Sequence, residues 1–182
     1  MIAAIVLAAG ASSRLGSPKQ LAMLGTETLL ERAVRVAREA SCRPVIVLGA
    51  SAGLIQERCS LDGVQVALNE DWASGMGSSI VCGVKAVGDA DGVVVMTCDM
   101  PAVSPVHLRI LIDSGEVAAS GYAGRRGVPA YFPAVFFPEL MKMRGDAGAR
   151  ELLQQARVVE LAGGELDVDT VEELQRAQCL LG

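Results

Sequence analysis

An apolar run that opens into a loop of small residues and cations constrains this chain more than any other feature. Residues 2–9 are apolar throughout, which is typical of a short β-strand buried on both faces. The sequence LAAGASSRLGSPK then spans residues 7–19, with Arg14 and Lys19 among small side chains. Backbone N–H groups approach a phosphate closely where side chains are small, and cations offset its charge. The stretch predicts a phosphate-binding loop, although an ordinary strand-to-helix turn is also small and polar.

Two familiar phosphate loops do not fit these residues. The dinucleotide fingerprint G-x-G-x-x-G needs three glycines, and only Gly10 and Gly16 are present. A Walker A loop needs Lys-Ser or Lys-Thr after its second glycine, whereas Gly16 precedes Ser17 and Lys19 precedes Gln20. The stretch instead fits L-A-A/G-G-x-S-x-R-M/L-G-x-x-K at every fixed position. In this it resembles the MobA-like nucleotidyltransferases.

The order of elements predicts an α/β fold. The 182 residues suit one domain, and a hydrophobic fraction of 51% with 3% aromatics fits buried parallel strands covered by helices. Further strands are expected at residues 45–48, 64–68, 92–98, 117–122 and up to 133, and helices at 28–40, 50–58, 78–87, 104–114, 150–156 and 170–180. Alternating strands and helices predict parallel pairing with right-handed crossovers. We expect one three-layer, Rossmann-like domain over residues 1–182, with a mostly parallel sheet and helices on both faces; the resemblance implies the nucleotide-diphospho-sugar transferase type.

Charge and cysteine content argue against several classes of protein. The formal net charge is −5 and the basic residues are dispersed, so nucleic acid is not an expected partner. No apolar run approaches the ~20 residues of a membrane span, and no cationic segment precedes the first strand as in a signal peptide. The five cysteines form no C-x-x-C pair. We therefore expect reduced thiols in a cytoplasmic protein, without a zinc site.

A second glycine-rich segment, NEDWASGMGSSI, covers residues 69–80. Gly75 and Gly77 free the backbone, and Ser78 or Ser79 is expected to cap the following helix, which is also all that an ordinary helix start requires. In the molybdenum cofactor cytidylyltransferases, the branch of the family that this chain resembles most, a similar segment lies against the nucleotide. The resemblance implies a nucleotide-binding set of Leu7, Ala8, Ala9, Gly10, Ser12, Ser13, Gly75, Gly77 and Ser78. Trp72 is expected to pack at the base of the loop or to stack on a ligand.

A carboxylate follows the most apolar strand, in the sequence Asp99-Met100-Pro101. At the carboxyl end of a central parallel strand, Asp99 would face the crevice in which such sheets bind ligands. Asp99 could instead form a turn before Pro101. Mg²⁺ prefers oxygen ligands, usually one or two carboxylates with phosphates and water, so we expect Mg²⁺ as cofactor and Asp99 as its ligand. The family's Asp in this place holds the metal.

Near the C-terminus, the sequence LDVDTVE resembles the family's D-x-D-T-P-E-D-L, with Val171 in place of the proline. Asp169 and Glu172 have the spacing of a capping box, which predicts a structural role for Asp169. Asp167 points to the other face of an extended segment and has no such role. We nominate Asp167 as a second metal or nucleotide ligand.

The acceptor side is less well defined. Arg125 and Arg126 precede Gly127-Val128-Pro129, where the cytidylyltransferases usually carry Gly-His-Pro, so the contribution of that histidine is absent here. The family's Gly-Asp-x-Gly-Ala-Arg is matched by GDAGAR at residues 145–150. Candidate acceptor contacts are Arg125, Arg126, Asp146 and Arg150. His107 has no partner motif and is expected to be a surface or packing residue.

The expected reaction is transfer of a nucleoside monophosphate from an NTP to a phosphorylated acceptor, with release of pyrophosphate. Arg14, Lys19 and Asp99 are the expected catalytic residues, because positioning and charge neutralisation suffice for an acceptor that is already anionic. Ala8-Ala9-Gly10 matches the cytidylyl members, whereas guanylyl members carry Ala-Gly-Gly, so the resemblance favours CTP and implies molybdopterin cofactor as acceptor, with a molybdoenzyme as a possible partner. Alternatives are GTP, a sugar or alditol phosphate acceptor, or a non-catalytic protein that delivers cofactor.

Overall fold

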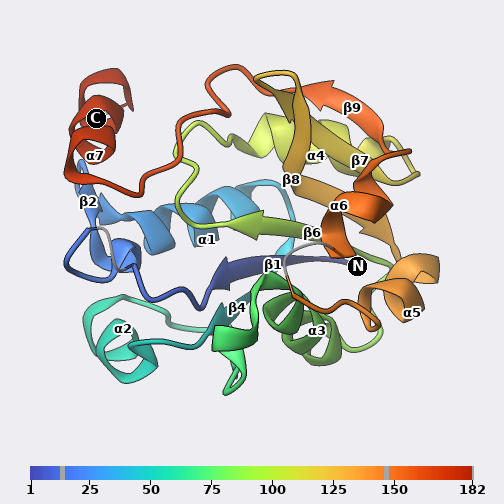
Figure 1. Ribbon diagram of the computed structural model, residues 1–182, viewed down its shortest axis with the longest axis horizontal. Helices are drawn as coiled ribbons and strands as arrows, with labels where there is room; N and C mark the ends of the chain where they lie inside the picture. The colour runs from blue at the N-terminus through green and yellow to red at the C-terminus, as the bar shows by residue number, and fades with distance from the viewer. Residues whose placement is uncertain (13–14, 146–147, 182) are drawn as a thin grey trace.

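A seven-stranded sheet forms the centre of the molecule, as the computed structural model of residues 1–12, 15–145 and 148–181 shows (Figure 1). Its order is β5-β4-β1-β6-β8-β7-β9. The strands are β1 (Ile2–Ala8), β4 (Arg43–Leu48), β5 (Gln65–Leu68), β6 (Gly92–Thr97), β7 (Ala118–Tyr122), β8 (Arg125–Pro133) and β9 (Arg157–Glu160). β1 pairs in parallel with β4 and β6, and β4 with β5. β8 runs antiparallel to β6 and β7, and β9 is parallel to β7, which confirms the mostly parallel sheet.

Helices cover both faces of this sheet because its strands are apolar on both sides. They are α1 (Leu29–Glu39), α2 (Ala52–Arg58), α3 (Met76–Val87), α4 (Pro105–Asp113), α5 (Phe137–Leu140) and α6 (Gly148–Leu153), whereas α7 (Val171–Leu181) packs in a separate small core. Alternate residues of β1 enter different cores: Val6 packs with α1 and α4, whereas Ile5 packs with α3, α5 and α6. This two-residue period produces the predicted three layers.

A third, smaller core was not expected from the sequence. The hairpin of β2 (Met23–Leu24) and β3 (Glu27–Thr28) packs against the last helix, α7. The buried members of this core are Leu24, Leu29, Leu166, Val168 and Ala177. Two-residue strands carry no periodic signal, and β9, also missed, is a four-residue edge strand that is mostly exposed.

The sheet's topology places several loops at one edge. β1, β4 and β6 end there because they are parallel, and β7 also ends there because it is antiparallel to β8, which is antiparallel to β6. The chain after β9 crosses past the end of β6 before it reaches α7 (Figure 1), and Val168 N donates to Asp99 O at 2.9 Å. Ligands of such sheets bind outside the carboxyl ends of the strands. Among the described residues, none of the helices combines the length and apolarity needed to cross a membrane.

Candidate active site

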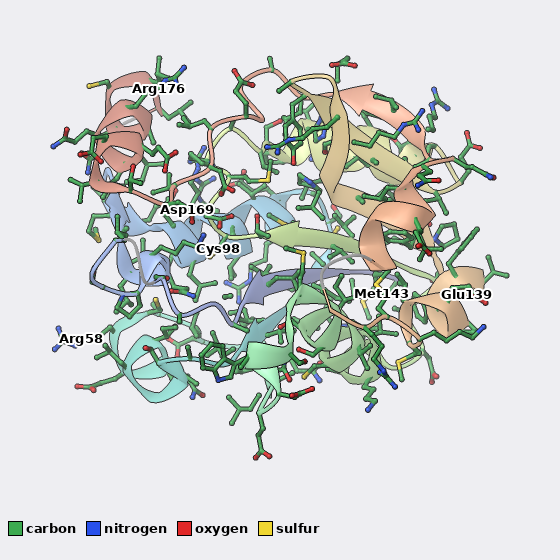
Figure 2. All side chains as sticks on the ribbon, viewed as in Figure 1. Arg58, Cys98, Glu139, Met143, Asp169 and Arg176 are labelled. Carbon is green, nitrogen blue, oxygen red and sulfur yellow. The ribbon has the colours of Figure 1, made fainter. Side chains whose placement is uncertain are left out.

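A partly buried lysine and its carboxylates lie at the carboxyl end of β6. Lys19 opens a 3-10 turn after the first loop, and its Nζ forms ion pairs with Asp99 and, at 2.6 Å, with Asp169 Oδ1. Lys19 and Asp169 are 150 positions apart in the sequence. Figure 2 labels Asp169 and Cys98, the residue that precedes Asp99, which is joined to Asp169 through Lys19. The fold thus joins the first loop, the end of β6 and the C-terminal segment in one place.

The charge of Lys19 is secured by this arrangement. Burial alone would lower its pKa, but the carboxylates of Asp99 and Asp169 outweigh burial and hold the pKa well above its usual range. Lys19 is therefore a fixed cation at physiological pH, paired with Asp99 and Asp169.

Two oxygens of the cluster have no hydrogen-bond partner among the described residues. These atoms are Asp99 Oδ1 and Asp167 Oδ1, and both are buried. Burial, and then the nearby charge of Asp99, raise the pKa of Asp167 to about 7. Buried unpaired oxygens are costly, and two carboxylate oxygens are the donor set from which Mg²⁺ is usually held. Asp99 and Asp167 therefore fit a divalent cation that takes its other ligands from phosphates and water, although no three His, Cys, Asp or Glu side chains in residues 1–12, 15–145 and 148–181 form a metal-binding group.

The capping role predicted for Asp169 is wrong. α7 begins at Val171, so the capping residue is Thr170 and its partner is Glu173. Glu173 N donates to Thr170 Oγ1 at 3.2 Å, and Thr170 N donates to Glu173 Oε2 at 2.9 Å. Because the cap lies one residue later than predicted, the Asp169 side chain does not cap the helix and pairs with Lys19 instead. No local signal could have revealed that pairing, because its partner lies at the other end of the chain.

A cavity of about 350 Å³ adjoins this cluster. Its lining residues are Leu7, Ala8, Ala9, Gly10, Lys19, Gln20, Trp72, Ala73, Gly75, Met76, Ser79, Thr97, Cys98 and Asp99. The lining therefore unites the first loop, the segment before α3 and the end of β6, as the sequence predicted. Met76, Ser79, Thr97, Cys98 and Gln20 were missed because apolar or small polar residues next to a motif carry no chemical signature of their own.

Other residues predicted to contact the nucleotide, Gly77 and Ser78, lie beside this cavity and form hydrogen bonds to other parts of the protein. α3 begins at Met76 rather than at residue 78, and no side chain of the described residues caps it, so the predicted cap at Ser78 or Ser79 is wrong. Gly77 N donates to Gly145 O at 2.8 Å, and a Cβ on Gly77 would lie only 2.6 Å from that oxygen. The Ser78 and Ser79 hydroxyls both accept from Asn69 Nδ2, at 2.8 and 3.0 Å.

Several candidates fall outside what the structure describes. Ser13, Arg14 and Asp146 lie outside the described residues, as does the side chain of Arg150. Ser12 is described and its hydroxyl bonds within the loop rather than lining the cavity. His107 is buried with its Nε2 2.8 Å from Ser120 Oγ, which confirms a packing residue.

A second cavity, of about 540 Å³, lies at the ends of β7 and β9. Arg125 and Arg126 line it with Tyr122 and Glu160, and the Arg125 guanidinium lies 5.1 Å from the centre of the Tyr122 ring. Burial raises the pKa of Tyr122, Arg125 opposes that shift, and the charges of Asp167 and Asp99 add to it. A wall of this cavity is therefore within electrostatic reach of the carboxylate pair.

Curated relatives match nearly the whole chain. The chain is 35% identical to nicotine blue oxidoreductase of Paenarthrobacter nicotinovorans, over 96% of its length and 95% of the relative's. It is 30% identical to a Bacillus mycoides protein named probable molybdenum cofactor guanylyltransferase, over 97% of its length and 95% of that protein's.

Solved structures and a family match agree with the fold. Rv0371c of Mycobacterium tuberculosis superimposes with a TM-score of 0.86 at 35% identity, covering 97% of this chain and 96% of that one. Another structure of Rv0371c is a complex with manganese, with a TM-score of 0.80 at 32% identity and 99% coverage of both chains. A 4-diphosphocytidyl-2C-methyl-D-erythritol synthase of Anaerococcus prevotii, at 14% identity and a TM-score of 0.76 over 100% of this chain and 96% of that one, shares the fold, which is that of the nucleotide-diphospho-sugar transferases. Residues 4–161 match the MobA-like NTP transferase domain. The chain therefore belongs to the MobA-like family of nucleotidyltransferases.

Proposed function

We propose that the chain, as one domain over residues 1–182, transfers CMP from CTP to a phosphorylated acceptor, with Mg²⁺ held by Asp99 and Asp167. The observation that carries the proposal is the meeting of one fixed cation, Lys19, with two buried and unpartnered carboxylate oxygens beside the first loop. A triphosphate with its metal ion complements this combination of charges.

The reaction requires little from the protein beyond positioning the two reactants and offsetting the negative charge on their phosphates. An oxygen of the acceptor phosphate attacks the α-phosphorus, a new P–O bond forms, and the α–β bridging bond breaks to release pyrophosphate. The acceptor is already anionic, so no general base is needed. Lys19 offsets negative charge on the triphosphate, with Arg14 proposed as a second cation. When bound, Mg²⁺ supplies further positive charge to the phosphate oxygens.

The proposal of CTP rests on the first loop. Ala9 lines the cavity and is buried, and its methyl group narrows a pocket that glycine would widen, which favours a pyrimidine over a purine. GTP is the rival nucleotide, and the observation in its favour is the guanylyltransferase name of the Bacillus mycoides relative. Tighter binding of Mg·GTP than of Mg·CTP would overturn the choice of CTP.

For the acceptor we propose molybdopterin cofactor, entering by the cavity at the ends of β7 and β9. Two guanidinium groups, those of Arg125 and Arg126, line that cavity and suit an anionic group. Asp146 and Arg150 stay as further candidates. A sugar or alditol phosphate would meet the same charges, so the acceptor must be tested directly. A molybdoenzyme that receives the product is the partner that this acceptor implies.

A redox activity is a second candidate because the relative with 35% identity is named an oxidoreductase. Hydride transfer from a nicotinamide dinucleotide would call for the three-glycine fingerprint, of which the first loop has only Gly10 and Gly16. Incubation with NADH or NADPH and a quinone-like dye separates the two. Consumption of the reductant that survives Asp99→Ala would replace the transferase proposal.

The deciding experiment follows label from α-³²P-CTP or α-³²P-GTP into molybdopterin cofactor, a sugar phosphate or an alditol phosphate, with Mg²⁺ present. We expect labelled cytidylyl product and pyrophosphate, and a fall of about 10²–10³-fold for Asp99→Ala. Asp113→Ala, on the exposed side of α4, is the matched control. Tight cofactor binding without turnover would indicate a delivery protein instead.

The five free cysteines support a cytoplasmic site for the reaction.

A further inference from the structure

A glutamine is buried where the first loop rejoins the fold. Gln20 is only 1% exposed and ranks among the largest fully buried side chains. Its Nε2 donates to Ala8 O at 2.8 Å and to Gly10 O at 3.2 Å. Burial of an amide is unfavourable unless its hydrogen bonds are made, so these two bonds define where the side chain must lie.

The other atoms of this network belong to Ser12 and Lys19. Ser12 Oγ donates to Gln20 Oε1 at 3.4 Å and accepts from Lys19 N at 2.9 Å. Ser12 adopts a φ of 53°, in the left-handed region that a serine enters only when its surroundings hold it there. The amide of Gln20 thus connects the beginning of the loop, at Ala8 and Gly10, with its end, at Lys19.

We propose that Gln20, acting through Ser12, is a positioning residue that holds residues 8–12 and Lys19 of the phosphate loop in their binding shape before the nucleotide arrives. The inference rests on the proposed function only for the identity of the ligand. Because these bonds hold the backbone at Ala8, Gly10, Ser12 and Lys19, the N–H groups of residues 8–12 and 19 need no ordering when phosphates bind, which favours binding and transfer. The carboxamide is specific to this task, because it offers donors on one atom and an acceptor on the other.

The substitution Gln20→Glu tests the donor function with almost no change in shape. A carboxylate would face the carbonyls of Ala8 and Gly10 without a donor, so we expect kcat/KM for the nucleotide to fall about 30-fold at pH 8, a change of ~2 kcal/mol. At pH 6 a protonated glutamic acid can donate to one carbonyl, and the loss, measured relative to wild type at each pH, shrinks. KM for the acceptor stays unchanged. Gln56→Glu, the same charge change at an exposed position on α2, leaves unaltered kcat/KM for the nucleotide at pH 8, the same quantity at pH 6, and KM for the acceptor.

Two further readouts keep the inference testable. If Gln20→Glu does not fold, Ser12→Ala removes the central hydroxyl alone, and a fall of about 10-fold is expected. Hydrogen exchange at the Lys19 amide, whose acceptor is Ser12 Oγ, speeds up in Ser12→Ala whether or not nucleotide is bound.

The outcomes separate this inference from the proposed function. The only tryptophan, Trp72, lines the same cavity, so its fluorescence reports nucleotide binding directly. If the wild type binds neither CTP nor GTP, the proposed function fails, and the exchange rate at Lys19 still decides the role of Gln20 and Ser12. A folded Gln20→Glu protein with unchanged kcat/KM, a loss that does not vary with pH, or unchanged exchange at Lys19 in Ser12→Ala would overturn the inference.

Discussion

At the scale of single residues, the site consists of charged side chains that are largely removed from water and paired with one another. Lys19 and Asp99 retain 16% and 9% of their side-chain exposure, so water does little to screen their ion pair. Removal of one partner from a buried pair leaves an uncompensated charge, which is far more harmful than loss of an exposed pair. Lys19 therefore stabilises the protein without a ligand and is also the cation that a triphosphate would meet.

The substitution Lys19→Met should test both proposed roles of this lysine, in stability and in turnover. We expect the free energy of unfolding, measured in urea without divalent ions, to fall by about 3 kcal/mol because Asp99 and Asp169 lose their counter-charge. Mg²⁺ should restore part of that stability, while turnover stays about 10²–10³-fold below wild type. Lys142→Met is the control: its exposed pair with Glu139 contributes at most about 1 kcal/mol. Equal effects at the two positions would contradict the assigned charge balance.

Asp167 makes stability depend on pH. Its pKa is raised to about 7 in the folded protein, by burial and by Asp99, whereas an unperturbed Asp has a pKa of about 3.9. The folded state thus binds a proton that the unfolded state releases, and this carboxyl destabilises the fold progressively as pH rises from about 4 to about 7. We expect Asp167→Asn to raise the melting temperature more at pH 8.5 than at pH 4.5, with lower activity.

Two controls accompany this melting experiment. Asp89→Asn, at an exposed position, should leave the difference between the two pH values unchanged. Mg²⁺ should raise the melting temperature of the wild type at pH 8.5 and should do so less for Asp167→Asn. A pH-independent effect of Asp167→Asn would remove Asp167 from the group of charges around Asp99.

At the scale of elements, the C-terminal segment brings two acids to a site whose other residues lie between positions 7 and 99. Val168 is fully buried in the small core with Leu24 and Ala177, so Asp167 and Asp169 lie on either side of an anchored residue. Gln178 Nε2 also donates to Met23 O at 3.0 Å, which ties α7 to the β2–β3 hairpin. The small core therefore holds these two acids in position as well as contributing stability.

Val168→Ala and Val87→Ala separate these contributions. Both valines are buried, and each truncation should lower the free energy of unfolding by about 1–2 kcal/mol. Val87 lies at the end of α3 far from Met76, in the core on the other face of the sheet, so its substitution should leave kcat/KM near wild type. Val168→Ala should lower kcat/KM about 10-fold because Asp167 and Asp169 shift with the backbone. Equal activities would show that the segment's position does not matter for turnover.

The secondary-structure elements also show which features of the site could be predicted from the sequence alone. β1, the cationic loop and the carboxylate after β6 are local patterns, so the position of Lys19 and Asp99 at one edge of the sheet could be predicted. The pairing of Lys19 with Asp169 depends on packing between the two ends of the chain, which no periodicity encodes. The capping box was misplaced by one residue, because Asp169 and Thr170 are both good caps and only the start of α7 decides between them.

At the scale of the whole molecule, two cavities lie at the same edge of the sheet: Asp99 lines one, and Tyr122, whose pKa the charges of Asp167 and Asp99 raise, lines the other. The smaller is lined by the first loop and the start of α3, and the larger by the ends of β7 and β9. A nucleotide in the first and an acceptor in the second would meet beside Asp99 and Asp167. Nucleotide binding should therefore link segments that belong to different layers of the fold.

Hydrogen exchange can measure that linkage. With Mg·CTP at 100 times its Kd, we expect about 2.7 kcal/mol of added global stability and slower exchange together in residues 7–12, 75–79 and 166–170. The β7–β8 turn at residues 122–125 should gain protection only when the acceptor is added as well. In Asp99→Ala, protection of residues 166–170 should disappear while that of residues 7–12 is reduced, because the metal ion no longer joins them. Protection confined to residues 7–12 in the wild type would mean that the nucleotide touches the first loop alone, and the C-terminal carboxylates would then have no part in binding it.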